Sequence, residues 1–145
     1  MKSVYIATSL LNVEQARSII KRFQKHNIHV THDWTKHGQV FSERELKEFG
    51  IAEMDGVKNA DLLFMIHPAR TGTHVELGIA LGCNKPVIIV FNKQIHWRRR
   101  FITWFNMLIG KKPSQPELKT FYFVPNVSRF ASLEEAFNFA LEKLL

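Results

Sequence analysis

The chain has 145 residues, of which 46% are hydrophobic and 23% are charged, a balance typical of one globular domain. No apolar run approaches the roughly 20 residues that a membrane-spanning helix needs, and the amino terminus leads into a strand-like segment rather than a secretory signal. Cys83 is the only cysteine, which excludes an intrachain disulfide, and these features together predict a cytoplasmic protein. The net charge of +7 favours anionic partners in general and selects none of them.

Short apolar runs alternate with longer amphipathic runs along the chain. In chain order they predict a strand at 4–7, a helix at 13–25, a strand at 28–32, a helix at 43–57, a strand at 60–66, a helix at 73–83, strands at 86–91 and 120–124, and a helix at 132–145. Such alternation is typical of a parallel sheet covered by helices. We therefore predict an α/β fold: a flavodoxin-like, doubly wound, five-stranded parallel sheet with helices on both faces, forming a single domain over 1–145.

The segment 96–110 does not follow this alternation. Its aromatic and aliphatic residues would share one face of a helix, with Arg98, Arg99 and Arg100 around the rest of the circumference. The favoured interpretation is an extra helix packed on the domain or against another subunit. Contact with a membrane or with nucleic acid is the less favoured alternative. We expect no membrane partner.

Polar and small residues gather where the first three predicted strands end. In a doubly wound sheet, ligands bind at the carboxyl ends of the strands, where the strand order reverses. The candidate binding residues at these ends are Ser9, Asp33, Trp34, His67, Arg70, Gly72 and Thr73. The last of them lead into a helix, whose free N–H groups and dipole favour an anion.

Glu76 follows this group and allows two interpretations. Thr73-x-x-Glu76 matches a capping box, in which the glutamate only closes the start of a helix. Alternatively, Glu76 is a carboxylate at the ligand site that attacks an electrophilic sugar carbon. Glycoside chemistry generally requires a second carboxyl group to manage the proton of the leaving group. Four acidic residues are candidates for that role: Asp33, Glu53, Asp55 and Asp61.

Three segments share their spacing with one family of enzymes. They are Val4-Tyr5-Ile6-Ala7, Glu53-x-x-Gly56-Val57-x-x-Ala60-Asp61, and Gly72-Thr73-x-x-Glu76-Leu77-Gly78-x-Ala80-Leu81-Gly82-x-x-Lys85-Pro86-Val87. The sequence therefore resembles the nucleoside 2-deoxyribosyltransferases and the related deoxynucleoside 5'-monophosphate N-hydrolases. The resemblance is clear from residue 3 to about residue 91 and looser beyond.

The resemblance implies roles for four residues. Glu76 would be the nucleophile that forms a covalent glycosyl–enzyme intermediate, and the Tyr5 hydroxyl would position it. Glu53 stands where the family carries an aspartate that assists protonation of the departing base. Asn126 matches a polar residue that the family takes from a neighbouring subunit, which implies a homodimer or a larger homo-oligomer. Without the resemblance, Tyr5 would be an ordinary strand aromatic, and Asn126 a turn residue after Pro125.

Two further positions bear on the substrate. Arg70 departs from the family pattern, and beside a helix start it would make a good phosphate clamp; the alternatives are a solvated loop residue or an ion-pair partner of Asp33 or Glu53. Trp34 follows the second strand, where the family surrounds the base, so an indole could stack on the base while Asp33 accepts hydrogen bonds from it. The alternative for Trp34 is a core or interface aromatic.

The sequence therefore predicts an enzyme that cleaves the N-glycosidic bond of a nucleoside and transfers the sugar to another base by double displacement. The first alternative is a hydrolase that releases the base from a nucleoside 5'-monophosphate. The others are a non-catalytic nucleotide-sensing protein and a nucleic-acid-binding module. We expect no cofactor, and no metal, because His32, His67 and His74 lack the spacing of a recognisable ligand set.

Overall fold

The structure is a computed structural model that describes residues 1–36, 42–91 and 120–145. Its helices and strands, in chain order, are β1 (Ser3–Thr8), α1 (Val13–Lys25), β2 (His29–Val30), α2 (Glu43–Asn59), β3 (Leu62–Ile66), α3 (Thr71–Gly82), β4 (Val87–Val90), β5 (Val127–Phe130) and α5 (Leu133–Leu144). Short 3-10 turns are η1 (Leu10–Asn12), η2 (Trp34–Lys36) and η4 (Thr120–Phe123).

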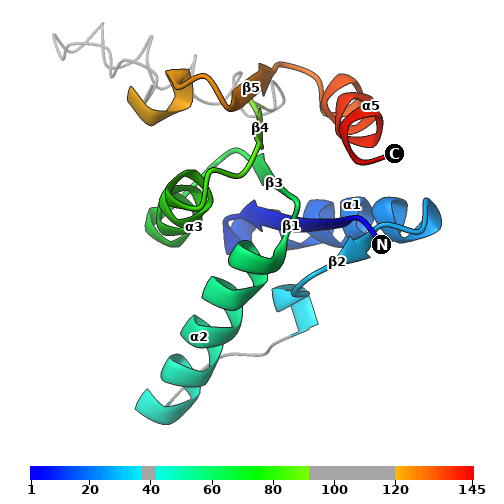
Figure 1. Cartoon of the computed structure of the whole chain (residues 1–145). Coiled ribbons are helices and arrows are strands. Elements are labelled where there is room, and N and C mark those ends of the chain that lie inside the picture. Colours follow the sequence, from blue (N-terminus) through cyan, green and yellow to red (C-terminus); the bar gives the residue numbers. More distant parts are fainter. Residues whose placement is uncertain (37–41, 92–119) are drawn as a thin grey trace, which may run out of the picture.

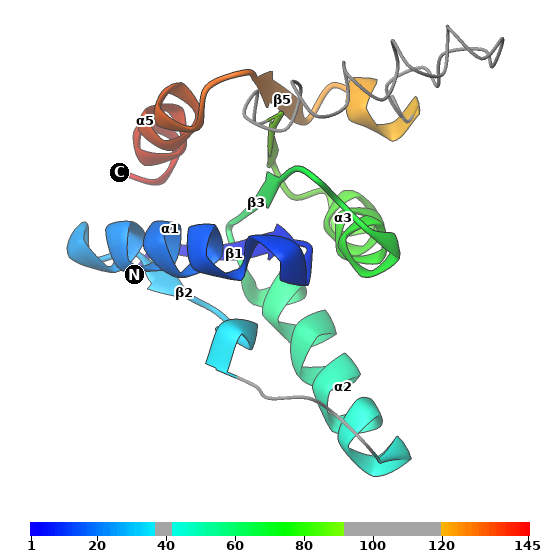
Figure 2. The same ribbon diagram turned by 180° about the vertical axis from the view of Figure 1, so that it is seen from behind.

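The five strands form one parallel sheet in the order β2-β1-β3-β4-β5. Helices α1 and α5 cover one face of the sheet, and α2 and α3 cover the other (Figures 1 and 2). The strand order reverses between β1 and β3, because the chain moves outward to β2 after β1 and in the opposite direction after β3. The predicted flavodoxin-like α/β architecture is therefore confirmed.

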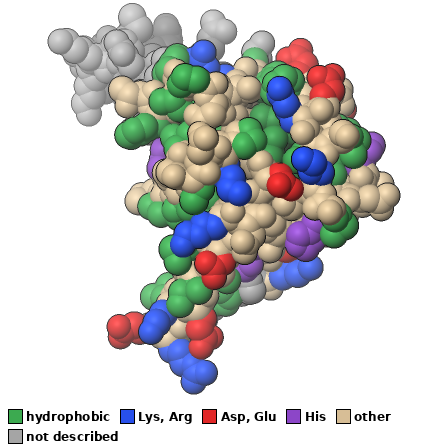
Figure 3. Space-filling model, viewed as in Figure 1, with side chains coloured by type: hydrophobic (Ala, Val, Ile, Leu, Met, Phe, Trp, Pro, Cys, Tyr) green, Lys and Arg blue, Asp and Glu red, His purple; other side chains and the backbone are tan. Residues whose placement is uncertain are grey.

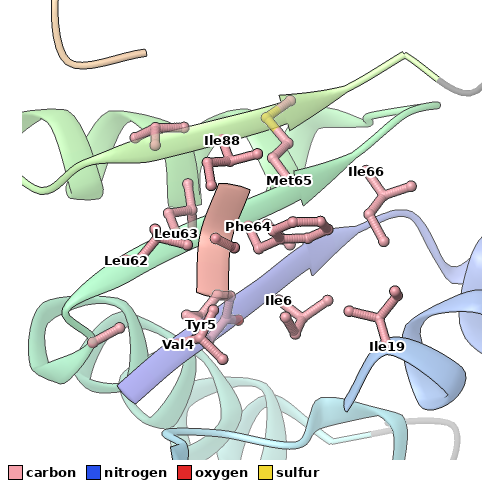
Figure 4. Packing of buried hydrophobic residues seen from close by; sticks show 14 of the residues in the cluster. Val4, Tyr5, Ile6, Ile19, Leu62, Leu63, Phe64, Met65, Ile66 and Ile88 are labelled. Carbon is pink, nitrogen blue, oxygen red and sulfur yellow. The ribbon is translucent and has the colours of Figure 1, made fainter. Parts of the chain in front are cut away.

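The core explains why these segments fold as they do. Every residue of β1, β3 and β4 is buried, as a parallel strand between two helical layers requires (Figure 4). In α1, the buried residues recur at helical spacing, and one of them, Phe23, packs edge-on against Phe64 of β3 at 5.5 Å between ring centroids. Phe23 also contacts Phe137 of α5 at 4.7 Å, so α1 and α5 share one core layer.

Helix α2 approaches the sheet closely at Gly56. A Cβ at this position would lie 2.7 Å from the Cβ of His32 and 3.0 Å from Cε2 of Tyr5, so no larger residue fits without a shift. The amino end of the same helix is capped by Ser42, whose hydroxyl accepts the N–H of Glu45 while the Glu45 carboxylate accepts the N–H of Ser42. The glycine thus brings α2 directly onto the ring of Tyr5.

One element of the prediction is wrong. The fifth strand is Val127–Phe130, and the predicted 120–124 contains the 3-10 turn η4 instead. In that turn Tyr122 is buried, whereas Phe121 and Phe123 are 62% and 54% exposed, an alternation that imitates a strand. The real strand is fixed by its bonds to β4, where the N–H groups of Val87 and Phe91 donate to the carbonyls of Asn126 and Phe130.

Other boundaries shift by a few residues. Helix α3 begins at Thr71 rather than at 73, and β2 is only two residues long. The segment 96–110, for which an amphipathic helix was predicted, lies outside the described residues. Within them, no helix combines the length and apolar character needed to cross a membrane. On the face seen in Figure 3, lysine and arginine side chains are scattered among acidic ones, in keeping with the dispersed charge of the sequence.

Candidate active site

The centre of the site is a hydrogen bond between Tyr5 and Glu76. Tyr5 lies in the middle of β1 and is fully buried, and its hydroxyl donates to Oε1 of Glu76 at 2.5 Å. Glu76 lies in the second turn of α3, so the bond joins the central sheet to the helix that covers it. The capping-box interpretation of Glu76 is wrong, because α3 begins at Thr71 and the Glu76 carboxyl is held by Tyr5.

The phenol ring is held in place from two sides. Its ring plane lies within 10° of the His32 imidazole plane, with 6.5 Å between centroids, and the backbone of Gly56 approaches its edge. Thr31 ties the same region to α2 by donating its hydroxyl to the Gly56 carbonyl at 2.7 Å. Strand β1, helix α2 and the end of β2 therefore fix the hydroxyl that meets Glu76.

Burial dominates the electrostatics of this pair. It raises the pKa of Glu76 to about 8, although the hydrogen bond from Tyr5 lowers that pKa and the nearby charge of Glu53 raises it. The pKa of Tyr5 is raised far above its usual range by burial, by the charge and hydrogen bond of Glu76, and by the charge of Glu53. Tyr5 is therefore a permanent donor. Glu53, on α2, is the acid whose charge reaches both members of the pair.

The two oxygens of Glu76 have different surroundings. Oε1 accepts the Tyr5 hydroxyl, whereas Oε2 has no hydrogen bond to any residue in the described part of the chain. A carboxylate held by one oxygen and open at the other is suited to attack an electrophilic carbon. The chemistry also requires the ionised form, which the raised pKa makes a minority at neutral pH.

Beside this pair lies the point where strand order reverses, at the carboxyl ends of β1 and β3. Thr8 donates its hydroxyl to the Ile66 carbonyl at 2.7 Å and accepts from the Asn12 amide at 2.9 Å, which joins the two strand ends. Ser9 follows, only 3% exposed, and its hydroxyl has no hydrogen-bond partner among residues 1–36, 42–91 and 120–145. A buried hydroxyl left in this way is available to a ligand or a water molecule.

Asp33 and Trp34 are largely engaged by the protein itself. The indole N–H of Trp34 donates to the Ile6 carbonyl at 2.8 Å, and the residue is 9% exposed, so the structure places it as a core aromatic. Asp33 accepts the Thr35 hydroxyl at 2.6 Å and lies 3.3 Å from the Lys36 ammonium; its hydrogen bonds lower its pKa despite partial burial. Both residues build the turn after β2, and their role toward a base stays a prediction.

The amino end of α3 carries the residues predicted to bind an anion. Arg70 precedes the helix and is exposed, and Gly72 has open space around its Cα where a side chain would project. Thr73 is 3% exposed and accepts the Arg70 backbone N–H at 3.5 Å. Within the described residues, Arg70 forms no ion pair with Asp33 or Glu53, so its guanidinium is available to a ligand.

A cluster of aromatic rings lies beside this turn and was not predicted from the sequence. The ring of His67, at the end of β3, stacks on Phe91 at 4.6 Å and meets the edge of Tyr122 at 5.4 Å. The Tyr122 hydroxyl lies 2.7 Å from Nε2 of His74 in α3. The spacing of these residues does not indicate the cluster, because Tyr122 is 48 residues from His74 in the sequence. The prediction of a strand at 120–124 also did not place Tyr122 beside α3.

Asn126 lies at the opposite edge of the sheet. It precedes β5, and its amide donates to the Lys85 carbonyl before β4 at 2.9 Å, so within one chain it is far from the carboxyl ends of the strands. This position agrees with the alternative of a turn residue. Completion of a neighbouring subunit's site by Asn126 stays a prediction.

An open groove of about 1160 Å³ lies between α3 and η4. Arg70, His74 and Leu77 are among the residues that line it, and Tyr5 and Glu76 are not. The groove thus reaches the amino end of α3 but does not include the Tyr5–Glu76 pair. In the described parts of the chain, no group of three or more histidine, cysteine or acidic side chains could hold a metal ion.

The comparisons identify the class of fold. No family model and no curated protein matches the sequence. Among solved structures, the chain is similar to a CMP N-glycosidase from Clostridium botulinum (TM-score 0.59, 16% identity, 97% of this chain and 99% of the other). It is also similar to a conserved protein from Enterococcus faecalis (TM-score 0.68, 16% identity, 100% of this chain and 99% of the other). A third similar structure is a 2-desoxiribosyltransferase from Leishmania mexicana (TM-score 0.61, 15% identity, 100% of each chain).

These similarities span nearly the whole of each chain. The protein therefore shares its fold with these solved structures, one of which is a 2-desoxiribosyltransferase, and the resemblance read from its sequence is confirmed at the level of the fold. At 15–16% identity the match does not extend to the individual activity.

Proposed function

We propose that the protein cleaves the N-glycosidic bond of a (deoxy)nucleoside and transfers the sugar to another nucleobase, with Glu76 as the nucleophile. The observation that carries this proposal is the partly buried Tyr5–Glu76 hydrogen bond, which occupies one carboxyl oxygen, while the other accepts no hydrogen bond from the described residues. The solved structures of similar fold include a 2-desoxiribosyltransferase and a CMP N-glycosidase, which supports nucleoside chemistry as the substrate class.

The reaction proceeds in two displacements. In the first, Oε2 of the ionised Glu76 forms a bond to the anomeric carbon while the bond to the base nitrogen breaks, and the bonding pair leaves with the base. Glu53 delivers a proton to that nitrogen or to a conjugated atom of the base. In the second, an acceptor base nitrogen attacks the same carbon, Glu76 departs as a carboxylate, and the acceptor's proton returns to Glu53. Two inversions give net retention of configuration.

Tyr5 acts on the nucleophile throughout. Its hydroxyl donates to Oε1 and so favours the ionised form, against the burial that disfavours it. The same buried surroundings leave the carboxylate poorly solvated, so its negative charge is available to the positive charge that develops on the sugar ring. Tyr5 is thus a direct partner of the reacting carboxylate.

Arg70 favours a second candidate, hydrolysis of a nucleoside 5'-monophosphate. Its exposed guanidinium stands beside the free N–H groups of the first turn of α3 and the open space at Gly72, which together suit a phosphate group. In this version water replaces the acceptor base and the products are free base and a sugar phosphate. Ser9, whose buried hydroxyl has no hydrogen-bond partner in the part of the chain that the structure describes, is a further candidate contact.

One assay tests both versions. The protein is incubated with purine and pyrimidine nucleosides, with and without a 5'-phosphate, in the presence and absence of a second base, and free and exchanged bases are separated by chromatography. Transfer gives a new nucleoside only with the acceptor, whereas hydrolysis gives free base without it. Glu76→Gln should abolish either product, and Glu142→Gln, at an exposed position of α5, is the matched control. Undiminished turnover by Glu76→Gln would refute the proposal.

A further inference from the structure

The chain has two tyrosines, and both hold helix α3. Tyr5 and Tyr122 are fully buried, and their hydroxyls bond to Glu76 and His74, two residues apart on that helix. Tyr5 belongs to the proposed chemistry. Tyr122 comes from a turn 48 residues away from His74 and has no part in the mechanism described so far.

The hydrogen bonds of His74 define its tautomer. Nδ1 lies 2.9 Å from the Arg70 carbonyl, and a carbonyl oxygen can only accept, so Nδ1 carries the proton. In the neutral ring Nε2 is then the acceptor, and the Tyr122 hydroxyl donates to it at 2.7 Å. The backbone N–H of His74 donates to the same Arg70 carbonyl at 3.1 Å. The Arg70 carbonyl, directly before α3, therefore accepts two hydrogen bonds from His74, and Tyr122 in turn holds the His74 ring.

The rings strengthen this arrangement. Tyr122 lies nearly parallel to His74, at 14° and 5.9 Å between centroids, and meets His67 edge-on at 5.4 Å. His67 directly follows β3 and His74 lies in the first turns of α3, so the Tyr122 side chain contacts both ends of the segment 67–74. That segment contains Arg70, and with it most of the predicted substrate contacts that follow β3.

We propose that Tyr122 and His74 are a positioning pair, which fixes the turn of residues 67–73 for substrate through the Arg70 carbonyl. The proposal rests on the proposed function for the identity of the ligand, but not for the hydrogen-bond arrangement itself. The pair orients the turn and does not touch the reacting atoms. Its loss should therefore weaken substrate binding and leave the Tyr5–Glu76 chemistry intact.

The two tyrosines provide a matched comparison. Tyr122→Phe keeps the ring contacts and removes one hydroxyl, and we expect it to raise KM about 3- to 10-fold, with kcat and its pH profile unchanged. Tyr5→Phe should instead lower kcat and change the pH profile. Ser3→Ala removes a buried hydroxyl that bonds to Asp61 at the amino edge of the sheet, and it should alter neither parameter. A Tyr122→Phe variant with wild-type KM, or with a changed kcat profile, would overturn the proposal.

Two readouts decide the matter even if no nucleoside is turned over. The first is a nitrogen–proton NMR spectrum of the imidazoles, in which the His74 signals are assigned by their loss in His74→Gln. His74 should be the Nδ1–H tautomer, and an Nε2–H tautomer would overturn the proposal. Amide hydrogen exchange at residues 74–76 should be about 3- to 10-fold faster in Tyr122→Phe and unchanged in Ser3→Ala. Equal exchange in both variants would show that Tyr122 only fills space. Failure of the base-release assay alone would count against the proposed function and not against the pair.

Discussion

The largely buried carboxyl of Glu76 makes the stability of the protein depend on pH. Its pKa is about 8 in the folded chain, against 4.5 as the ordinary value. Between these two pH values the folded state keeps a proton that the unfolded state has released, so the free energy of unfolding falls as the pH rises through this window. The contribution is complete below about pH 4.5 and is lost above about pH 8.

The size of the effect follows from the displacement of the pKa. If the whole displacement of the pKa contributed, the free energy of unfolding would change by about 5 kcal/mol. Because Glu76 is not completely buried and solvent screens part of the effect, we expect about half of this, or roughly 2 to 3 kcal/mol. Glu76→Gln keeps the shape and the acceptor for Tyr5 but cannot ionise. Its stability relative to wild type should therefore rise by that amount between about pH 5 and pH 8.5.

Urea unfolding followed by circular dichroism at several pH values measures this difference. Titrations of other groups are common to both proteins and cancel when wild type and variant are compared at each pH. Glu142→Gln, which removes an exposed carboxyl, should leave the difference from wild type nearly constant. If the curves of wild type and Glu76→Gln stay parallel over the whole range, the carboxyl is not buried as described and the reasoning is refuted.

Three further predictions concern the same site. Tyr5→Phe should raise the pKa of Glu76 and move the rising limb of the pH–rate profile to higher pH by about one pH unit. Glu53→Gln removes a neighbouring negative charge and should move the same limb to lower pH. Limbs that shift in the same direction in both variants would contradict this electrostatic account. Gly56→Ala should cost about 1 to 3 kcal/mol of stability, measured by urea unfolding, because its Cβ would meet the Cβ of His32 and the ring of Tyr5. A neutral effect would show that α2 can move away. Arg70→Gln should raise KM for 5'-monophosphates about tenfold and leave nucleosides unaffected, and an equal effect on both would exclude phosphate recognition.

The sequence was sufficient for the architecture because its apolar periodicity is strong. The buried face of α1 recurs at helical spacing, and β3 and β4 are continuous apolar runs, so their type and order followed directly. The position of the fifth strand was predicted wrongly because Phe121, Tyr122 and Phe123 alternate in burial as in a strand, although they form a 3-10 turn. Only pairing with β4, which is a tertiary property, distinguishes Val127–Phe130 as the strand.

The site was predictable only in part for the same reason. Glu76 and Tyr5 were named from a resemblance, but their hydrogen bond joins residues 71 positions apart, and no local pattern encodes it. Trp34 looked like a stacking surface, yet its indole N–H continues the hydrogen bonding of β1 where β2 has ended. The capping-box pattern of Thr73 and Glu76 was misleading because α3 starts two residues earlier than its sequence suggested.

The covalent intermediate on Glu76 is the claim that most of this account depends on. Wild-type protein, rapidly quenched during turnover of its best substrate and digested, should yield a peptide containing Glu76 that carries the mass of the substrate's sugar. Glu76→Gln should carry no such mass and should release no base. A sugar attached to a different residue, or full turnover by Glu76→Gln, would contradict the account.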